Sequence, residues 1–249
     1  MNVKPWSKMP VDWCGDDRLK SFTWREEGSA GTAALMLYFV ICHFSSEANH
    51  QLKELVTRMP ADPSLAPAED LVAHLTYDDF EVIAGLSRKL VSNGLSVLVE
   101  KRMIERLGNA RASDYALLGS ANRQFAKLPG KALVSDGGNS FRPLTHMRLR
   151  SRFELDALKL YYYYASIRDR NHVYSEAAYE TIFEKTGVSE RNIPVANALL
   201  LTTQFLARIE IGSGAGFRKR KTGANCYYLT GYTNFTDSRA VADNQDKAT

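Results

Sequence analysis

Cysteine is too scarce in this chain of 249 residues to build a disulfide framework or a common metal site. The three cysteines, Cys14, Cys42 and Cys226, are an odd number and lie far apart in the sequence. Disulfide-stabilised secreted domains and Cys-x-x-Cys zinc sites both need paired, suitably spaced cysteines. The cysteine content therefore indicates a reducing compartment, of which the cytoplasm is the simplest.

Long apolar segments are also lacking. The longest run, from Ala33 to Phe44, has the length of a buried helix, whereas a membrane-spanning helix needs about 20 apolar residues. Residues 1–28 contain tryptophans and acidic residues and lack the basic, apolar and small-residue regions of a signal peptide. We therefore expect a soluble cytoplasmic protein with no membrane association.

Catalytic and cofactor motifs are missing as well. The five histidines are scattered and show no His-Glu-x-x-His spacing. Gly212, Gly214 and Gly216 follow an expected strand, but Phe217 stands where the dinucleotide-binding fingerprint requires its third glycine. No phosphate-binding loop of the Walker type and no recoverable order of a catalytic triad are present. We expect a protein with no enzymatic activity, no cofactor and no metal.

Charge of both signs is present, and its distribution is uneven. The 32 basic and 28 acidic residues give a net charge of +4. Between Asn122 and Arg152, however, seven basic residues accompany a single acid, and four contiguous cations lie in a glycine-rich segment farther on, at Arg218, Lys219, Arg220 and Lys221. Contiguous cations repel one another unless an anion lies close, so both segments favour a polyanionic partner.

The periodicity of apolar residues predicts a helical protein. A helix over residues 29–46 is apolar on all sides and should be buried. Thr76 precedes two acidic residues and should begin a helix that ends near Gly85, and Ser87 should begin the next helix, over residues 88–101. That helix should bury Val91, Leu95, Leu98 and Val99. Strands are expected at 103–106 and 114–118, and a further helix at 153–169 whose run Tyr161–Tyr164 fills the core.

The sequence also contains an internal repeat. Adding 102 to the residue number places Gly85, Ser87 and Val91 on Gly187, Ser189 and Ile193, and the match continues to Arg106 and Arg208. The preceding helices match at an offset of 123, so the first copy carries 21 additional residues within 47–75. One departure is Pro194, which should kink the second copy's helix or delay its start.

These residues carry a resemblance to a known family. The runs LSRKLVSNGLSVLVEKRMIER (86–106) and TGVSERNIPVANALLLTTQFLARIE (186–210) resemble the helix-turn-helix and first wing strand of bacterial winged-helix proteins. Two copies in one chain also resemble plasmid replication initiators in architecture. The resemblance implies a mainly α fold with small β-hairpins and two tandem winged helix-turn-helix domains. We expect an irregular segment at 1–28, the two domains at 29–119 and 153–232, a basic linker at 120–152 and a disordered tail at 233–249.

The resemblance further implies binding to double-stranded DNA, because the second helix of such a motif enters the major groove with its N-terminal residues at base edges. Arginine and lysine can bond guanine, asparagine can bond adenine, and serine can hold phosphate. In the first copy the residues at these positions are Ser87, Arg88, Lys89, Ser92 and Asn93, and in the second copy Ser189, Arg191 and Asn192. Phosphate contacts are expected from Arg111 in the first hairpin turn, from Arg148 and Arg150 in the linker, and from Arg218–Lys221.

Three functions agree with these features. We expect a sequence-specific regulator of transcription, of the kind found on plasmids or mobile elements. A plasmid or phage replication initiator that binds iterated origin sites is the close alternative. The third, of another class, is a protein-interaction scaffold in which the tyrosines form the interface. The sequence leaves open whether the chain forms a homodimer.

Overall fold

The computed structural model describes residues 3–47, 67–107, 113–119, 124–169, 171–212 and 223–232. Arg111, the cluster Arg218–Lys221 and the tail 233–249 lie outside these residues. The described chain is a mixed α/β structure with three small antiparallel sheets. This agrees with the expected small hairpins and contains more strand than the sequence suggested.

The first copy of the repeat combines a buried helix with a helix pair and a sheet. Its elements are α3 (Ser29–Phe44), β2 (Ser46–Glu47), β3 (Pro67–Leu75), α5 (Tyr77–Ala84), α6 (Arg88–Glu100), β4 (Ile104–Leu107) and β5 (Ser113–Leu118). The strands pair antiparallel in the order β2-β3-β5-β4. Thr76 and Asp79 form a capping box at the start of α5, which stabilises the helix at the residue the sequence predicted.

The second copy repeats this arrangement in order. Its elements are α8 (Arg152–Ile167), β7 (Ser175–Ala177), α9 (Tyr179–Thr186), α10 (Ile193–Thr202), β8 (Leu206–Glu210) and β9 (Asn225–Leu229). The strand order β7-β9-β8 corresponds to β3-β5-β4 of the first copy. Strands β3 and β7, which precede α5 and α9, were not expected from the sequence, because three-residue strands and a strand that begins at proline give weak local signals.

The backbone conformation follows the same repeat. Gly85 and Gly187 end α5 and α9 in the left-handed region, at φ of 68° and 71°. Arg102 and Gln204, also 102 residues apart, take positive φ of 52° and 66° between helix and strand. Non-glycine residues rarely adopt this conformation. Two such residues at the same offset show that the repeat extends to the backbone of the turns.

The segments on either side of the first copy are more regular than the sequence indicated. Strand β1 (Trp6–Pro10) pairs antiparallel with β6 (Phe125–Pro129) along their full lengths. Short helices α1 (Asp12–Gly15), α2 (Trp24–Glu27) and α7 (Arg142–Thr145) and a 3₁₀ turn over Lys131–Leu133 complete these segments. Two five-residue strands far apart in the sequence have no connecting turn to reveal them, so the pairing escaped local analysis.

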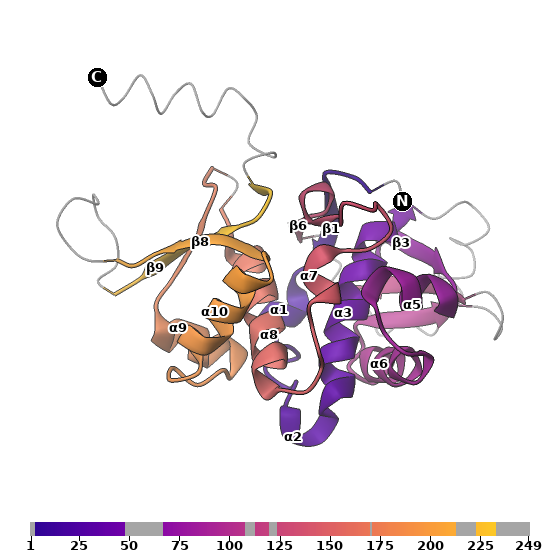
Figure 1. The fold of residues 1–249 in the computed structure, drawn as a ribbon, viewed down its shortest axis with the longest axis horizontal. Coiled ribbons are helices and arrows are strands. Elements are labelled where there is room, and N and C mark those ends of the chain that lie inside the picture. The colour runs from indigo at the N-terminus through magenta and orange to yellow at the C-terminus, as the bar shows by residue number, and fades with distance from the viewer. Residues whose placement is uncertain are drawn as a thin grey trace.

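One continuous hydrophobic core joins both copies. Figure 1 shows α3 and α8 at the centre of the molecule, with α5 and α6 beside α3, and α9 and α10 beside α8. Trp13 of the N-terminal segment packs edge-on against Tyr38 and Tyr162 at 5.1 Å from each ring centroid. The Tyr162 hydroxyl donates to the Leu35 carbonyl at 2.6 Å, which ties α8 directly to α3.

The tyrosine run of α8 fills this core. All four side chains from Tyr161 to Tyr164 are buried, as the sequence predicted. Val91, Leu95 and Leu98 of α6 are buried as expected, but Val99 is 45% exposed. Val99 follows Leu98 directly and therefore turns about 100° away from the buried stripe, which corrects its assignment to the core.

Several features of composition can now be placed. Cys14, Cys42 and Cys226 are free and buried, and burial raises the pKa of Cys14 and Cys42 far above the usual range. Within the described ranges, no cluster of three or more His, Cys, Asp or Glu side chains could hold a metal ion. No single described helix is long and apolar enough to span a membrane, although α5 and α6, bent by 102°, pass that test as a pair on length and composition.

Candidate nucleic-acid interface

Helix α6 presents a polar surface in the first copy. Ser87, Arg88, Lys89, Ser92 and Asn93 are all exposed, as the sequence predicted. Ser87 occupies the N-cap position, but its side chain makes no capping hydrogen bond. The spacing of these residues places them on one face, opposite the residues that pack on α3.

A glycine sets how closely α6 approaches the core. A Cβ at Gly94 would lie 2.8 Å from Leu37 Cδ1, 2.9 Å from the Ala34 nitrogen and 3.1 Å from the Ala33 carbonyl carbon. Two of these three neighbours are backbone atoms of α3, which cannot move aside by rotating a side chain. Gly94 therefore permits the close contact that holds the polar face of α6 in position.

Two residues that the sequence analysis did not select extend this surface. Two guanidinium groups lie over the Tyr77 ring, that of Arg88 at 5.3 Å and that of Arg106 at 5.7 Å from its centroid. Such contacts orient both guanidinium groups beside Tyr77, the first residue of α5. Tyr77 and Arg106 both have matching residues in the second copy, Tyr179 and Arg208, and this correspondence was the available signal.

Arg88 also pairs with an acid. Its Nη1 lies 2.8 Å from Asp78 Oδ1, and the two side chains are 66% and 80% exposed. Exposed ion pairs of this kind contribute about 0–1 kcal/mol, so a phosphate or a base edge can replace Asp78 at little cost. The pair holds Arg88 near the start of α6 in the absence of a ligand.

The second copy differs at the corresponding helix. Helix α10 begins at Ile193, three residues after the position that matches Arg88, and Pro194 occupies its first turn. This late start confirms the expected effect of the proline. The outward residues of α10 include the apolar side chains Val195, 46% exposed, and Leu201, 38% exposed. The exposed face of α10 is thus apolar where that of α6 is polar.

The late start changes where the predicted second-copy residues lie. Arg191 is exposed and Ser189 is half-buried, both in the turn before α10. Asn192 is buried, and its side chain hydrogen-bonds Asp156 of α8. The exposed position implied for Asn192 is therefore wrong, because the delayed helix leaves this residue in the turn, facing α8.

Ser189, Arg191 and Asn192 nevertheless share one site. They line a cleft of about 480 Å³ together with α8 and the segment that leads into α2. Its cations are Lys20, Arg25, Arg152, Lys159 and Arg191, and its acid is Asp156. Of these cations only Arg191 was predicted from the sequence, because the others come from segments that the fold alone brings together.

Lys159 is the buried member of this set. Its side chain is 3% exposed, and Nζ donates to the carbonyl oxygens of Phe22 at 2.6 Å and Lys20 at 3.3 Å. Burial lowers the pKa of Lys159 to about 8, while the nearby carboxylate of Asp156 acts in the opposite direction. Burial also raises the pKa of Asp156, against the influence of Lys159 and Arg152. At neutral pH the Lys159 ammonium is charged.

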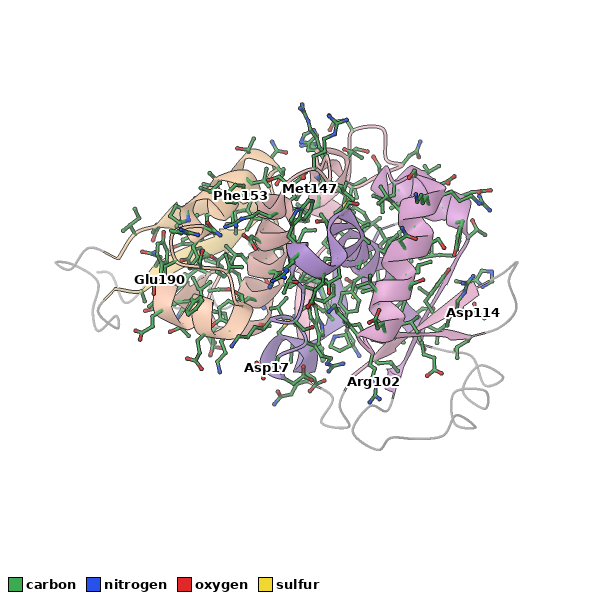
Figure 2. The ribbon with its side chains drawn as sticks, turned by 90° about the horizontal axis from the view of Figure 1, so that it is seen from below. Asp17, Arg102, Asp114, Met147, Phe153 and Glu190 are labelled. Carbon is green, nitrogen blue, oxygen red and sulfur yellow. The ribbon has the colours of Figure 1, made fainter. Side chains whose placement is uncertain are left out.

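Arg148 and Arg150 lie on an exposed loop that a buried carboxylate fixes. Glu154 accepts hydrogen bonds from four successive backbone N–H groups, of Arg148, Leu149, Arg150 and Ser151. Leu149 takes a positive φ of 55° within this loop. Figure 2 labels Met147 and Phe153, which lie just before and just after the segment Arg148–Arg152 in the chain. Both predicted arginines are exposed, so the loop presents them to solvent.

The remaining predicted residues, Arg111 and Arg218–Lys221, lie outside the described residues. Comparisons of the chain with protein-family models, with curated proteins and with solved structures found no match.

Proposed function

We propose that the chain is a sequence-specific double-stranded DNA-binding protein built on two tandem winged helix-turn-helix units. The observation that carries this proposal is the twofold occurrence of one arrangement. In each copy a helix ends at a left-handed glycine, a second helix follows, a residue with positive φ turns the chain, and two antiparallel strands complete the unit. This is the order of a helix-turn-helix followed by a wing.

The first copy supplies the residues for base readout. Arg88 and Lys89 can bond guanine and Asn93 can bond adenine, and all three are exposed near the start of α6. Arg148 and Arg150 supply phosphate contacts that carry no sequence information. The basic segment Arg218–Lys221 is proposed to contact phosphates in the same way.

Within this class we favour a regulator of transcription, of the plasmid or mobile-element type. A plasmid or phage replication initiator remains the close alternative, since two tandem units suit iterated sites. A single inverted repeat at a promoter would support the regulator, whereas a series of direct repeats at an origin would support the initiator.

The scaffold hypothesis is a third candidate, in which tyrosines form the interface. The four tyrosines of α8 are buried in the core and do not support it. Its remaining support is the exposed apolar face of α10.

Selection of bound sequences from a random duplex pool tests the proposal. We expect a defined consensus and an affinity that falls steeply with salt, by a slope of about −0.9 per phosphate contact. Arg88→Gln and Asn93→Ala should each relax one base position, at a cost of about 1–3 kcal/mol in discrimination. Glu100→Gln, at the other end of α6, is the matched control and should change neither.

The segment Arg218–Lys221 is tested on the selected duplex. Replacing the four cations by alanine should weaken binding to all sequences alike and reduce the salt slope. Binding that does not depend on salt, or a pool that yields no consensus, would refute sequence-specific DNA binding.

A further inference from the structure

The cleft beside α10 concentrates positive charge in a concave site. Five cations and one acid line a volume of about 480 Å³, within the usual range for sites that bind small molecules. Among the described residues, Lys20, Arg25 and Arg191 have no acidic side chain within ion-pair distance. Cations gathered in this way repel one another unless an anion lies between them.

Two residues that line this cleft carry buried polar groups. The Lys159 ammonium carries three N–H donors, of which the carbonyl oxygens of Phe22 and Lys20 accept two. Ser189 also lines the cleft, and its hydroxyl is buried and has no hydrogen-bond partner. A buried hydroxyl without a partner is costly, and an oxygen acceptor that reaches it from the cleft would remove that cost.

The left-handed glycine of the second turn brings these groups together. A Cβ at Gly187 would lie 3.1 Å from Lys20 Cγ and 3.9 Å from Lys159 Nζ. The turn before α10 therefore rests directly on the two lysines. The positive end of α10 adds to the field of the cations around it.

The winged-helix arrangement itself does not require this charge. In the first copy the α3 residues that match Arg152, Asp156 and Lys159 are Ser29, Ala33 and Met36, at the same offset of 123. The first copy folds with small or apolar residues at these places. The charges at Arg152, Asp156 and Lys159 are therefore particular to the second copy, and the arrangement that the two copies share does not need them.

We propose that this cleft binds a phosphate group, held by Arg191, Arg152, Lys159 and the hydroxyl of Ser189. The phosphate belongs either to a small phosphorylated molecule or to the backbone of a bound duplex, since both present the same oxygens. Binding here does not depend on base readout by α6. The site combines residues of the second copy with the segment Lys20–Arg25. The proposed function assigns no role to that segment.

The test measures binding of inorganic phosphate to the full chain by calorimetry at low ionic strength. We expect a Kd of about 1 mM or tighter, with shifts of the Gly187 and Ser189 amide resonances. The double variant Ser189→Ala and Arg191→Gln should weaken phosphate binding by tenfold or more, because charge-assisted hydrogen bonds are each worth about 1.5–3 kcal/mol. Arg191 is exposed and the Ser189 hydroxyl makes no hydrogen bond, so neither substitution removes a contact of the fold.

Lys185→Gln serves as the matched control, because Lys185 is an exposed cation of α9 that does not line the cleft. It should leave phosphate binding unchanged. No binding by the parent chain at millimolar phosphate, or equal losses in the cleft variant and the control, would overturn the proposal.

A second measurement identifies the source of the phosphate. If the cleft variant weakens a mixed-sequence duplex and phosphate competes with that duplex, the site holds the DNA backbone. If duplex affinity is unchanged while phosphate binding is lost, the site takes a small phosphorylated molecule. Either result supports the site. Failure of the proposed function would instead show in the Arg88 and Asn93 variants, whose readout is sequence preference.

Discussion

The carboxylate of Glu154 should be worth more to stability than any exposed helix cap of this protein. Its side chain is 6% exposed and accepts four backbone N–H groups, with Leu149, Arg150 and Ser151 at 3.1, 2.8 and 3.0 Å and Arg148 as the fourth donor. One oxygen serves Arg148 and Leu149, and the other serves Arg150 and Ser151. The loop that carries the two predicted arginines depends on both oxygens.

Glu154→Gln keeps the shape of the side chain and removes one acceptor. The amide oxygen can retain two N–H groups, and the amide NH₂ then faces the other two. A buried N–H left without a partner costs about 1–3 kcal/mol, and these groups are only part-buried. We therefore expect the free energy of unfolding to fall by about 2 kcal/mol, near the lower limit for two such groups. Asp79→Asn in the capping box of α5 is the matched control. In that exposed cap the Asp79 carboxylate accepts one backbone N–H, that of Thr76, together with the Thr76 hydroxyl, so its loss should cost about 1 kcal/mol.

Urea denaturation of both variants measures this difference, provided that the slope of the unfolding free energy against urea concentration is the same as in the parent chain. Exchange of the amide hydrogens of Leu149, Arg150 and Ser151 should accelerate in Glu154→Gln and remain slow in Asp79→Asn. Duplex affinity should fall for all sequences alike, because Arg148 and Arg150 lose their fixed positions. A loss of stability no larger than that of Asp79→Asn, with amide exchange unaltered, would refute the role assigned to the carboxylate.

Two further predictions concern the core. Gly94→Ala should lower the free energy of unfolding by about 2 kcal/mol, because the clash of the new Cβ with the α3 backbone outweighs the better helix propensity of alanine. Denaturant titration measures this change, and equal or greater stability of the variant would contradict the prediction. Burial lowers the pKa of His43 to about 4, below about 6.5 in an unfolded chain. Between pH 6.5 and pH 4 the unfolded chain therefore binds a proton at His43 that the folded chain does not bind. The neutral, buried ring contributes its full share to the free energy of unfolding above pH 6.5, and this share falls by up to about 3 kcal/mol as the pH is lowered to 4. His43→Gln should flatten the pH dependence of stability in this window, whereas an identical slope would show that the ring is protonated in the fold, donating to both the Phe39 and Pro129 carbonyls.

Local signals explain why the helix pair of the first copy could be predicted. Thr76, Gly85 and Ser87 mark helix ends through short-range geometry, and the structure begins or ends a helix at each of them. The second copy then followed from the repeat. The pairing of β1 with β6 and the strands β3 and β7 had no such local marks, since their partners lie far away in the sequence.

The charged cleft could not be predicted for a related reason. Lys159 occupies an ordinary helical position in the sequence, and its burial depends on the Lys20 and Phe22 carbonyls from the opposite end of the chain. Pro194 correctly predicted a late start of the second copy's helix. A late start also implies that Asn192 lies in the turn before the helix and not on its exposed face. The sequence thus identified the correct turn but not the residues that surround it.

The contrast between the two copies assigns them different expected roles. Helix α6 exposes cations and amide groups suited to base edges, whereas α10 exposes Val195 and Leu201 and places its charge in the turn before the helix. Base discrimination and phosphate binding are separable contributions to affinity. We therefore expect substitutions in α6 to change which sequences are bound, and substitutions around Arg191 to change how tightly phosphate is held. A variant in the turn before α10 that altered the selected consensus would show that the second copy reads bases despite its apolar helix.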